Sequence, residues 1–371
     1  MSEFDIDEIL KKAEKKKKLK AVIIILVILL IIAFIFLGIY FLVAHNKNDK
    51  VVEQPAEQED VLIVKANQPE ENSVKIFSGN KRPVAVMIDN NVNAWPQYSL
   101  NKAYIVYEAI VEAQETRLMA VFKSNDVDMI GPVRSSRHYF LDYALENDAI
   151  YAHLGWSPQA QKDISSLGVN NINGQVYDTG AARTNTSKYW REKSKSAPHN
   201  AFTSLNGLYQ IAQEKGYRTT SDKKSVLNYV TGEVDLEDGV DANTVTIPYS
   251  NSNIVKYVYN SELEKYERYS RGEKQKDGST GEDVVTKNII ITFAQNYTLN
   301  DPEKKGRQGL YNIGTCDGYY ITNGKAIKIK CKKSSRNAQT VYTDLDGNEI
   351  QVNDGNTFIQ ICPLKANVKI N

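Results

Sequence analysis

Residues 21–44 form an uninterrupted apolar segment, AVIIILVILLIIAFIFLGIYFLVA, with no charged side chain in 24 positions. A helix of this length rises about 1.5 Å per residue and spans roughly 36 Å, more than the ~30 Å hydrocarbon core of a bilayer. A cleavable signal peptide has a shorter apolar stretch of roughly 7–15 residues, followed by a small-residue cleavage site. Here the polar sequence HNKNDK follows. The segment therefore predicts one uncleaved transmembrane helix.

The distribution of lysine around this segment predicts its orientation. Seven lysines lie between Lys11 and Lys20, directly before the apolar segment, whereas only Lys47 and Lys50 closely follow it. Because positively charged flanks stay on the cytoplasmic side, residues 1–20 are expected to be a basic cytosolic leader. The sequence thus predicts a single-pass protein of the cell membrane, with a cytoplasmic N-terminus and an extracytoplasmic bulk.

The rest of the chain divides by composition into a linker and two folded regions. Residues 45–73 contain seven acidic residues against three lysines and two prolines, which is typical of a solvated linker. The remaining length suffices for two ordinary domains. We expect an α/β or α+β domain over residues 74–225 and a mostly β domain over residues 240–365, preceded by the transmembrane helix.

The first folded region mixes strand and helix patterns. VAVMI, after Pro83, is a buried-strand pattern, and TRLMAVFKS, VDMIGPV and DAIYAHLG are read as further strands. KAYIVYEAIVEA fits either a strand or a helix, because periodicity does not separate the two. Helices are expected after Ser157, with a stop at Gly168, and after Ser204 or Asn206. Strands alternating with short helices indicate a layered α/β or α+β domain.

The second folded region reads as a succession of strands from about Thr244 onward. Asn323-Gly324 and Asp346-Gly347 are two-residue hairpin signals flanked by alternating apolar residues. No long helical pattern interrupts the strands, so this half is predicted to be mostly β.

Charge and cysteine content exclude several classes of function. The net charge of +1 and the lack of a long basic stripe argue against a nucleic-acid partner. Cys316, Cys331 and Cys362 form no CxxC pair and have no accompanying histidine cluster, so a zinc site is not expected. We expect buried free thiols.

The segment GPVRSSRHYFLDYA concentrates positive charge at one point of the first region. Aromatic residues at helical spacing predict a helix that begins near Ser135 or Ser136, which places Arg134 and Arg137 at its N-terminus. That end of a helix already carries about half a positive charge, so adding arginines is unfavourable unless an anion is bound.

We therefore expect Arg134, Ser135 and Arg137 to bind a phosphate or a carboxylate. The alternative is that a local acid, such as Asp142 or Glu146, neutralises the two arginines. The sequence favours the anion but leaves both interpretations open.

Other candidate residues follow at strand ends and in a long loop. His153 and Trp156 come at the carboxyl end of a predicted strand, where site residues often lie, although a single histidine there is as often structural. Arg191, His199 and Asn200 lie in a polar loop that is either a solvated surface or part of the ligand site.

Asp89 ends the first predicted strand and is a candidate metal ligand or base, or equally a turn residue. No established catalytic motif is present, and the sequence leaves open whether the protein is an enzyme.

Several segments together resemble the YerB-like bacterial lipoprotein family, a two-part domain of unknown function found mainly in Gram-positive bacteria. They are RPVAVMIDN, RLMAVF, IGPVRSSR, AHLGWSPQA and APHN in the first half and NGKAIKI, DGNEIQV and GNTFIQICP in the second. The resemblance implies no established activity. Two departures are notable. No cysteine precedes Cys316, so the predicted span would replace a lipid anchor, and Ala113-Gln114-Glu115 stands where the family pattern has a Gly-Gly pair.

A weaker similarity links the first region to the LytR-CpsA-Psr enzymes, which transfer wall polymers from a lipid pyrophosphate. By that analogy, Arg134 and Arg137 would hold phosphate and Asp89 would hold Mg²⁺, a cofactor expected only in this case. Our main expectation is a membrane-anchored extracytoplasmic protein of the cell envelope that binds an anionic or wall-derived ligand or a protein partner. The alternative is a phosphotransferase acting on a lipid-linked envelope polymer.

Overall fold

The structure is a computed structural model that describes residues 73–123 and 126–371. The expected leader, transmembrane helix and nearly all of the linker lie outside these residues. Within the described ranges, no helix is both long enough and apolar enough to cross a bilayer. The described residues all belong to one compact unit.

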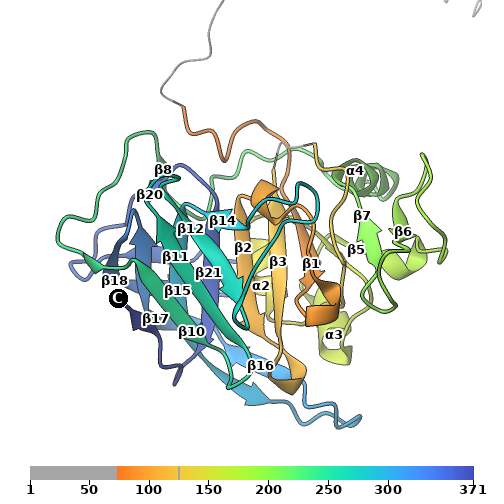
Figure 1. The fold of residues 1–371 in the computed structure, drawn as a ribbon. Helices are drawn as coiled ribbons and strands as arrows, with labels where there is room; N and C mark the ends of the chain where they lie inside the picture. The colour runs from red at the N-terminus through yellow and green to blue at the C-terminus, as the bar shows by residue number, and fades with distance from the viewer. Residues whose placement is uncertain (1–72, 124–125) are drawn as a thin grey trace, which may run out of the picture. The chain divides into compact units, whose positions relative to one another are not determined.

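One large mixed sheet contains strands from both halves of the chain (Figure 1). The first half contributes β1 (Val84–Asp89), β2 (Ile105–Ile110), β3 (Thr116–Phe122), β4 (Ile150–His153) and β5 (Asn171–Asn173). The second half contributes β9 (Val240–Asp241), β15 (Asn288–Thr298), β16 (Gln308–Tyr311), β17 (Gly314–Thr322), β18 (Lys325–Lys333), β19 (Val341–Thr343) and β21 (Thr357–Pro363). The halves join where β21 runs parallel to β2 on one side and to β15 on the other.

The central strands form because their sequences suit burial on both faces. β1, β2 and β3 are buried along their whole length, and their apolar runs are typical of such strands. The ambiguous segment KAYIVYEAIVEA contains strand β2, since β3 and β21 satisfy its backbone on both sides. Pairing with neighbouring strands thus makes this segment a strand, although its periodicity also fits a helix.

A second sheet packs against the large one. It contains β10 (Thr244–Pro248), β11 (Ile254–Asn260), β12 (Lys265–Ser270), β13 (Glu273–Lys274), β14 (Val285–Thr286) and β22 (Lys369–Ile370). Its inner face meets β21, where the Tyr257 and Phe358 rings lie 6.0 Å apart and Gln360 donates a hydrogen bond to Tyr257. Two small sheets pair β6 (Tyr189–Arg191) with β7 (Ala201–Thr203) and β8 (Tyr229–Val230) with β20 (Val352–Asn353).

The described helices are short. The α-helices are α2 (Phe140–Glu146), α3 (Pro158–Ser166) and α4 (Leu205–Glu214), and the 3-10 turns are η1 (Val92–Ala94), η2 (Leu100–Lys102), η3 (Glu112–Gln114) and η4 (Gly174–Val176). The predicted caps of α3 and α4 are confirmed, because Ser157 accepts from Ala160 and Ser204 accepts from Gly207. The architecture is two-part and mostly β with few helices, as expected for the second half. The three cysteines are free, with Cys331 and Cys362 buried and Cys316 half-buried.

Two local predictions are wrong. VDMIGPV forms no strand and pairs only through single bridges such as Ile130 with Thr203, because Pro132 has no N–H with which to extend a ladder. The helix expected near Ser135 begins instead at Phe140. Its first turn is replaced by extended backbone, since the amides of Arg134 and Ser136 donate to Met87 and Gly155. Those amides are therefore not free to hold an anion.

Two buried ion pairs connect the halves. Glu108 on β2 and Arg268 on β12 are both fully buried, with Nη2 and Oε2 2.7 Å apart. Glu146 of α2 and Lys333 of β18 are nearly as buried, and their charged atoms are also 2.7 Å apart. Burying a charge costs several kcal/mol unless it is paired, so each half supplies the partner that the other requires.

Replacing Glu108 with glutamine leaves Arg268 buried without a counter-charge. We expect Glu108→Gln to lower the free energy of unfolding by about 3–5 kcal/mol, measured by urea denaturation. The matched control is Asp317→Asn, which removes an exposed carboxylate paired with Lys330 and should change stability by less than about 0.5 kcal/mol. Equal effects of the two variants would contradict this account.

The turn between β2 and β3 has left-handed backbone at two residues that are not glycine. Ala113 has φ 55° and ψ 28°, and Gln114 has φ 60°. These are the positions at which the resemblance led us to expect a Gly-Gly pair. A side chain with a Cβ is disfavoured there by about 1–2 kcal/mol, a cost that glycine avoids.

Ala113→Gly is therefore expected to stabilise the protein by about 1 kcal/mol, seen as a higher midpoint of thermal unfolding. Ala182→Gly is the control, because Ala182 is exposed in a loop and is not among the residues with positive φ. There the greater freedom of glycine in the unfolded chain should lower stability slightly. A fall in the midpoint for Ala113→Gly would show that the turn is not strained.

Candidate functional site

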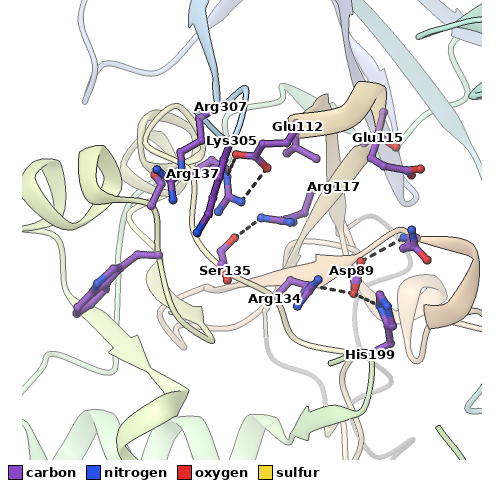
Figure 2. A pocket seen from close by; sticks show the side chains of 15 residues that line it. Asp89, Glu112, Glu115, Arg117, Arg134, Ser135, Arg137, His199, Lys305 and Arg307 are labelled. Carbon is purple, nitrogen blue, oxygen red and sulfur yellow. Dashed lines mark hydrogen bonds and ion pairs between the residues drawn. The ribbon is translucent and has the colours of Figure 1, made fainter. Parts of the chain in front are cut away.

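A cavity of about 430 Å³ opens where β1 ends, beside the β2–β3 turn (Figure 2). Its walls carry five arginine or lysine side chains and three carboxylates, an unusual density of charge for one cavity. The lining residues are Asp89, Asn91, Val111, Glu112, Glu115, Thr116, Arg117, Arg134, Ser135, Arg137, Trp156, Ser157, His199, Lys305 and Arg307.

Asp89 is the centre of one charged group. Its Oδ2 lies 2.7 Å from Nδ1 of His199 and 2.9 Å from Nε of Arg134, and its Oδ1 accepts from the amide of Asn91 (Figure 2). β1 positions this carboxylate, because Asp89 is the last residue of a strand paired with β3. The three side chains come from three separate segments and converge only in the folded protein.

Arg137 is neutralised by a neighbouring acid. Its Nε and Nη2 donate to the two carboxylate oxygens of Glu112, at 2.6 and 2.8 Å. Burial alone would raise the pKa of Glu112, but this bidentate pair outweighs burial, and the net shift is downward. An acid therefore lies against Arg137, as the alternative interpretation expected, but that acid is Glu112 and not Asp142 or Glu146.

Arg117 is the most buried cation of the cavity. It extends from β3, is 7% exposed, and donates through Nη1 to the backbone oxygen of Ser135 at 2.7 Å. Its buried Nε has no hydrogen-bond partner in the structure. Burial, reinforced by repulsion from Arg137, lowers the pKa of Arg117 to about 10. A charged group with an unmet donor on a cavity wall is a favourable place for an anion.

The second half of the chain supplies the remaining cations, from the connection between β15 and β16. Arg307 pairs with Asp301 and Glu303, both at 2.7 Å, whereas Lys305 is mostly exposed and pairs only with Glu303. Exposed pairs of this kind contribute little, so the Lys305 amine remains available to a ligand at the rim. Residues from both halves of the chain therefore line one cavity.

The structure brings together some of the predicted site residues and not others. Asp89, Arg134, Ser135, Arg137, Trp156 and His199 line the cavity. His153 does not, since it is fully buried and its Nδ1 lies 2.8 Å from the Gly155 oxygen. Arg191 and Asn200 bond to each other across the β6–β7 hairpin, where Asp178 also pairs with the arginine.

Five charged residues of the cavity were not predicted from the sequence, namely Glu112, Glu115, Arg117, Lys305 and Arg307. Only Arg117 had a usable signal, as a charged residue inside the apolar strand TRLMAVF. The other residues reach the cavity only because the fold brings distant segments of the chain together.

The expectation of a metal at Asp89 has little support in this geometry. The oxygen Oδ2 already faces a guanidinium and an imidazole N–H, which occupy the positions that a cation would take. Among the described residues, no group of three histidine, cysteine, aspartate or glutamate side chains is placed to hold a metal ion.

Comparison with known proteins gives consistent matches. The DUF3048 N-terminal domain, described as a protein of unknown function, matches residues 71–218, and the corresponding C-terminal domain matches residues 245–359. The chain is 32% identical over 286 residues to "Putative lipoprotein YerB" of Bacillus subtilis (strain 168), covering 76% of this chain and 82% of that protein. The crystal structure of the Bacillus subtilis YerB protein superposes with a TM-score of 0.68, covering 78% of this chain and 94% of that one.

His153 generates a prediction for stability against pH. Burial lowers its pKa to about 4, whereas an unfolded histidine titrates near 6.5. Between these values the unfolded chain binds a proton that the folded chain does not, so stability falls as the pH is lowered. From pH 7 to pH 5, His153 should account for a loss of about 2 kcal/mol.

The measurement is the free energy of unfolding at pH 7 and pH 5 for the wild type and for His153→Gln. The variant should lose about 2 kcal/mol less across this range, whatever its stability at pH 7. If the wild type and the variant lose the same free energy of unfolding between pH 7 and pH 5, His153 has the same pKa in the folded and unfolded states, which would contradict this prediction.

Proposed function

The chain belongs to the DUF3048 family, whose function is unknown, and from that premise we propose that it is a membrane-anchored, extracytoplasmic protein of the cell envelope that binds an anionic ligand in this cavity. The location is supported by the relative named as a lipoprotein and by the predicted span at residues 21–44. The anionic ligand is supported by the cavity itself.

The observation that carries the proposal is the buried guanidinium of Arg117, to which no carboxylate is hydrogen-bonded. Its counterpart Arg137 has a bidentate carboxylate, but Arg117 hydrogen-bonds only to a backbone oxygen and keeps an unmet Nε donor. Arg134 shares Asp89 with His199, and only its Nε faces that carboxylate. A phosphate or carboxylate at this point would complete the hydrogen bonding of Arg117 and Arg134 together.

The ligand is expected to carry an organic part as well as the anion. Trp156 lines the same cavity and offers an apolar ring beside the cations, and Lys305 lies at the rim. This combination suits a phosphorylated or carboxylated component of the envelope. A phosphotransferase dependent on Mg²⁺ is less well supported, because Asp89 is engaged by Arg134 and His199.

Calorimetric titration of the full chain in detergent with pyrophosphate tests the proposal. The wild type should bind saturably, and Arg134→Ala should weaken binding at least tenfold, because it removes a donor and leaves Asp89 to repel the anion. Raising the salt concentration should weaken binding in the wild type.

The matched control is Arg218→Ala. Arg218 is a half-exposed arginine that pairs with Asp148 and does not line the cavity. Its variant should bind as the wild type does. Absence of binding in the folded wild type, or equal weakening by both substitutions, would contradict the proposal.

A further inference from the structure

His199 lines the cavity and has one ring nitrogen paired with Asp89, whereas the other has no hydrogen-bond partner among the described residues. Nδ1 lies 2.7 Å from Oδ2 of Asp89, so it carries the proton and donates it to the carboxylate. Nε2 makes no hydrogen bond with any described residue, yet it is not among the buried atoms that lack a partner. Since His199 lines the cavity, its basic nitrogen is accessible to a bound ligand and to water.

Asp89 is held in place independently of His199. The carboxylate is only 5% exposed, its Oδ1 accepts from the Asn91 amide, and Arg134 lies against the Oδ2 atom. A fixed, buried carboxylate behind an imidazole selects one tautomer and one ring orientation. Asp89 is thus a positioning residue for His199.

The contact between Asp89 and His199 is not needed to hold the loop in place. The loop that carries His199 is already attached by backbone bonds, from Val133 to Ala201 and from Glu192 to Asn200. Lys195 of the same loop also donates to the backbone oxygens of Ala94 and Trp95. The loop therefore does not depend on the imidazole for attachment, and a structural contact does not require an accessible Nε2.

The groups around the cavity match the needs of phosphoryl hydrolysis. Arg117 and Arg134 are placed to hold phosphoryl oxygens, and Trp156 offers an apolar wall for the organic part of an ester. Positioning and charge stabilisation supply most of the catalysis of phosphoryl transfer. A positioned general base contributes a further factor of roughly 10²–10⁴.

We infer that His199 is the general base of a hydrolytic site for organic phosphomonoesters, an inference that rests on the proposed anion site. Nε2 takes a proton from a water molecule as that water's oxygen bonds to phosphorus. The bond from phosphorus to the ester oxygen breaks, and its electron pair leaves with that oxygen, which takes a proton from solvent. Inorganic phosphate and an alcohol are released, and His199 returns its proton to water.

The test uses p-nitrophenyl phosphate and the full chain in detergent, with EDTA present to suppress contaminating metal-dependent phosphatases. The wild type should release p-nitrophenolate well above the buffer rate. His199→Ala should lower kcat by at least a hundredfold and should regain at least tenfold on addition of imidazole, which a structural role would not produce.

Asp89→Asn should lower kcat by roughly ten- to a hundredfold, because an amide does not hold the productive tautomer. Arg218→Ala, outside the cavity, should leave the rate unchanged. Pyrophosphate titration of every variant separates the two proposals.

Binding without hydrolysis, or hydrolysis that His199→Ala does not reduce or imidazole does not restore, overturns the general base while the anion site stands. If the folded wild type does not bind pyrophosphate, both the general base and the anion site are overturned. Saturable binding together with imidazole-dependent rescue supports both.

Discussion

The ion pair between Glu108 and Arg268 is the interaction on which the rest of the structure depends. Both side chains are removed from water, and Asn90 and Thr116 complete the bonding of Glu108 at 3.1 and 2.7 Å. A charge in such a place is tolerated only with its partner present. Since Glu108 is on β2 and Arg268 on β12, each sheet supplies the charge that the other requires.

The cavity inherits its geometry from this arrangement. β2 leads into the turn that carries Glu112, and β1, two strands away in the sheet order, ends in Asp89. The β15–β16 connection, which brings Lys305, is fixed through the pairing of β15 with β21 and of β21 with β2. A site formed by both halves therefore requires that the halves fold together, and both buried ion pairs link them.

Local features of the fold could be predicted from sequence, and long-range features could not. Ser157 and Ser204 cap helices because that chemistry lies within three residues, and the Asn323-Gly324 turn has positive φ at both residues. The extended backbone at Arg134 depends instead on Met87, and the partner of Arg137 is Glu112, 25 residues away. Within the site, the sequence shows the two neighbouring arginines, Arg134 and Arg137. It does not show that Asp89 and Glu112 are their carboxylate partners.

Two buried arginines, Arg268 and Arg117, differ in how their charge is balanced. Burial acts to lower the pKa of Arg268, but Glu108 outweighs it, and the net shift is upward. Arg117 is 7% exposed and no carboxylate is hydrogen-bonded to it. Burial and repulsion from Arg137 outweigh the attraction of Asp89 and Glu112, so the pKa of Arg117 is lowered to about 10. Both guanidinium groups keep unmet donors, Nε and Nη1 in Arg268 and Nε in Arg117, but only Arg268 has a carboxylate bonded to it. Arg117 borders the cavity, where a bound anion would supply the hydrogen-bonded negative charge that Glu108 supplies to Arg268.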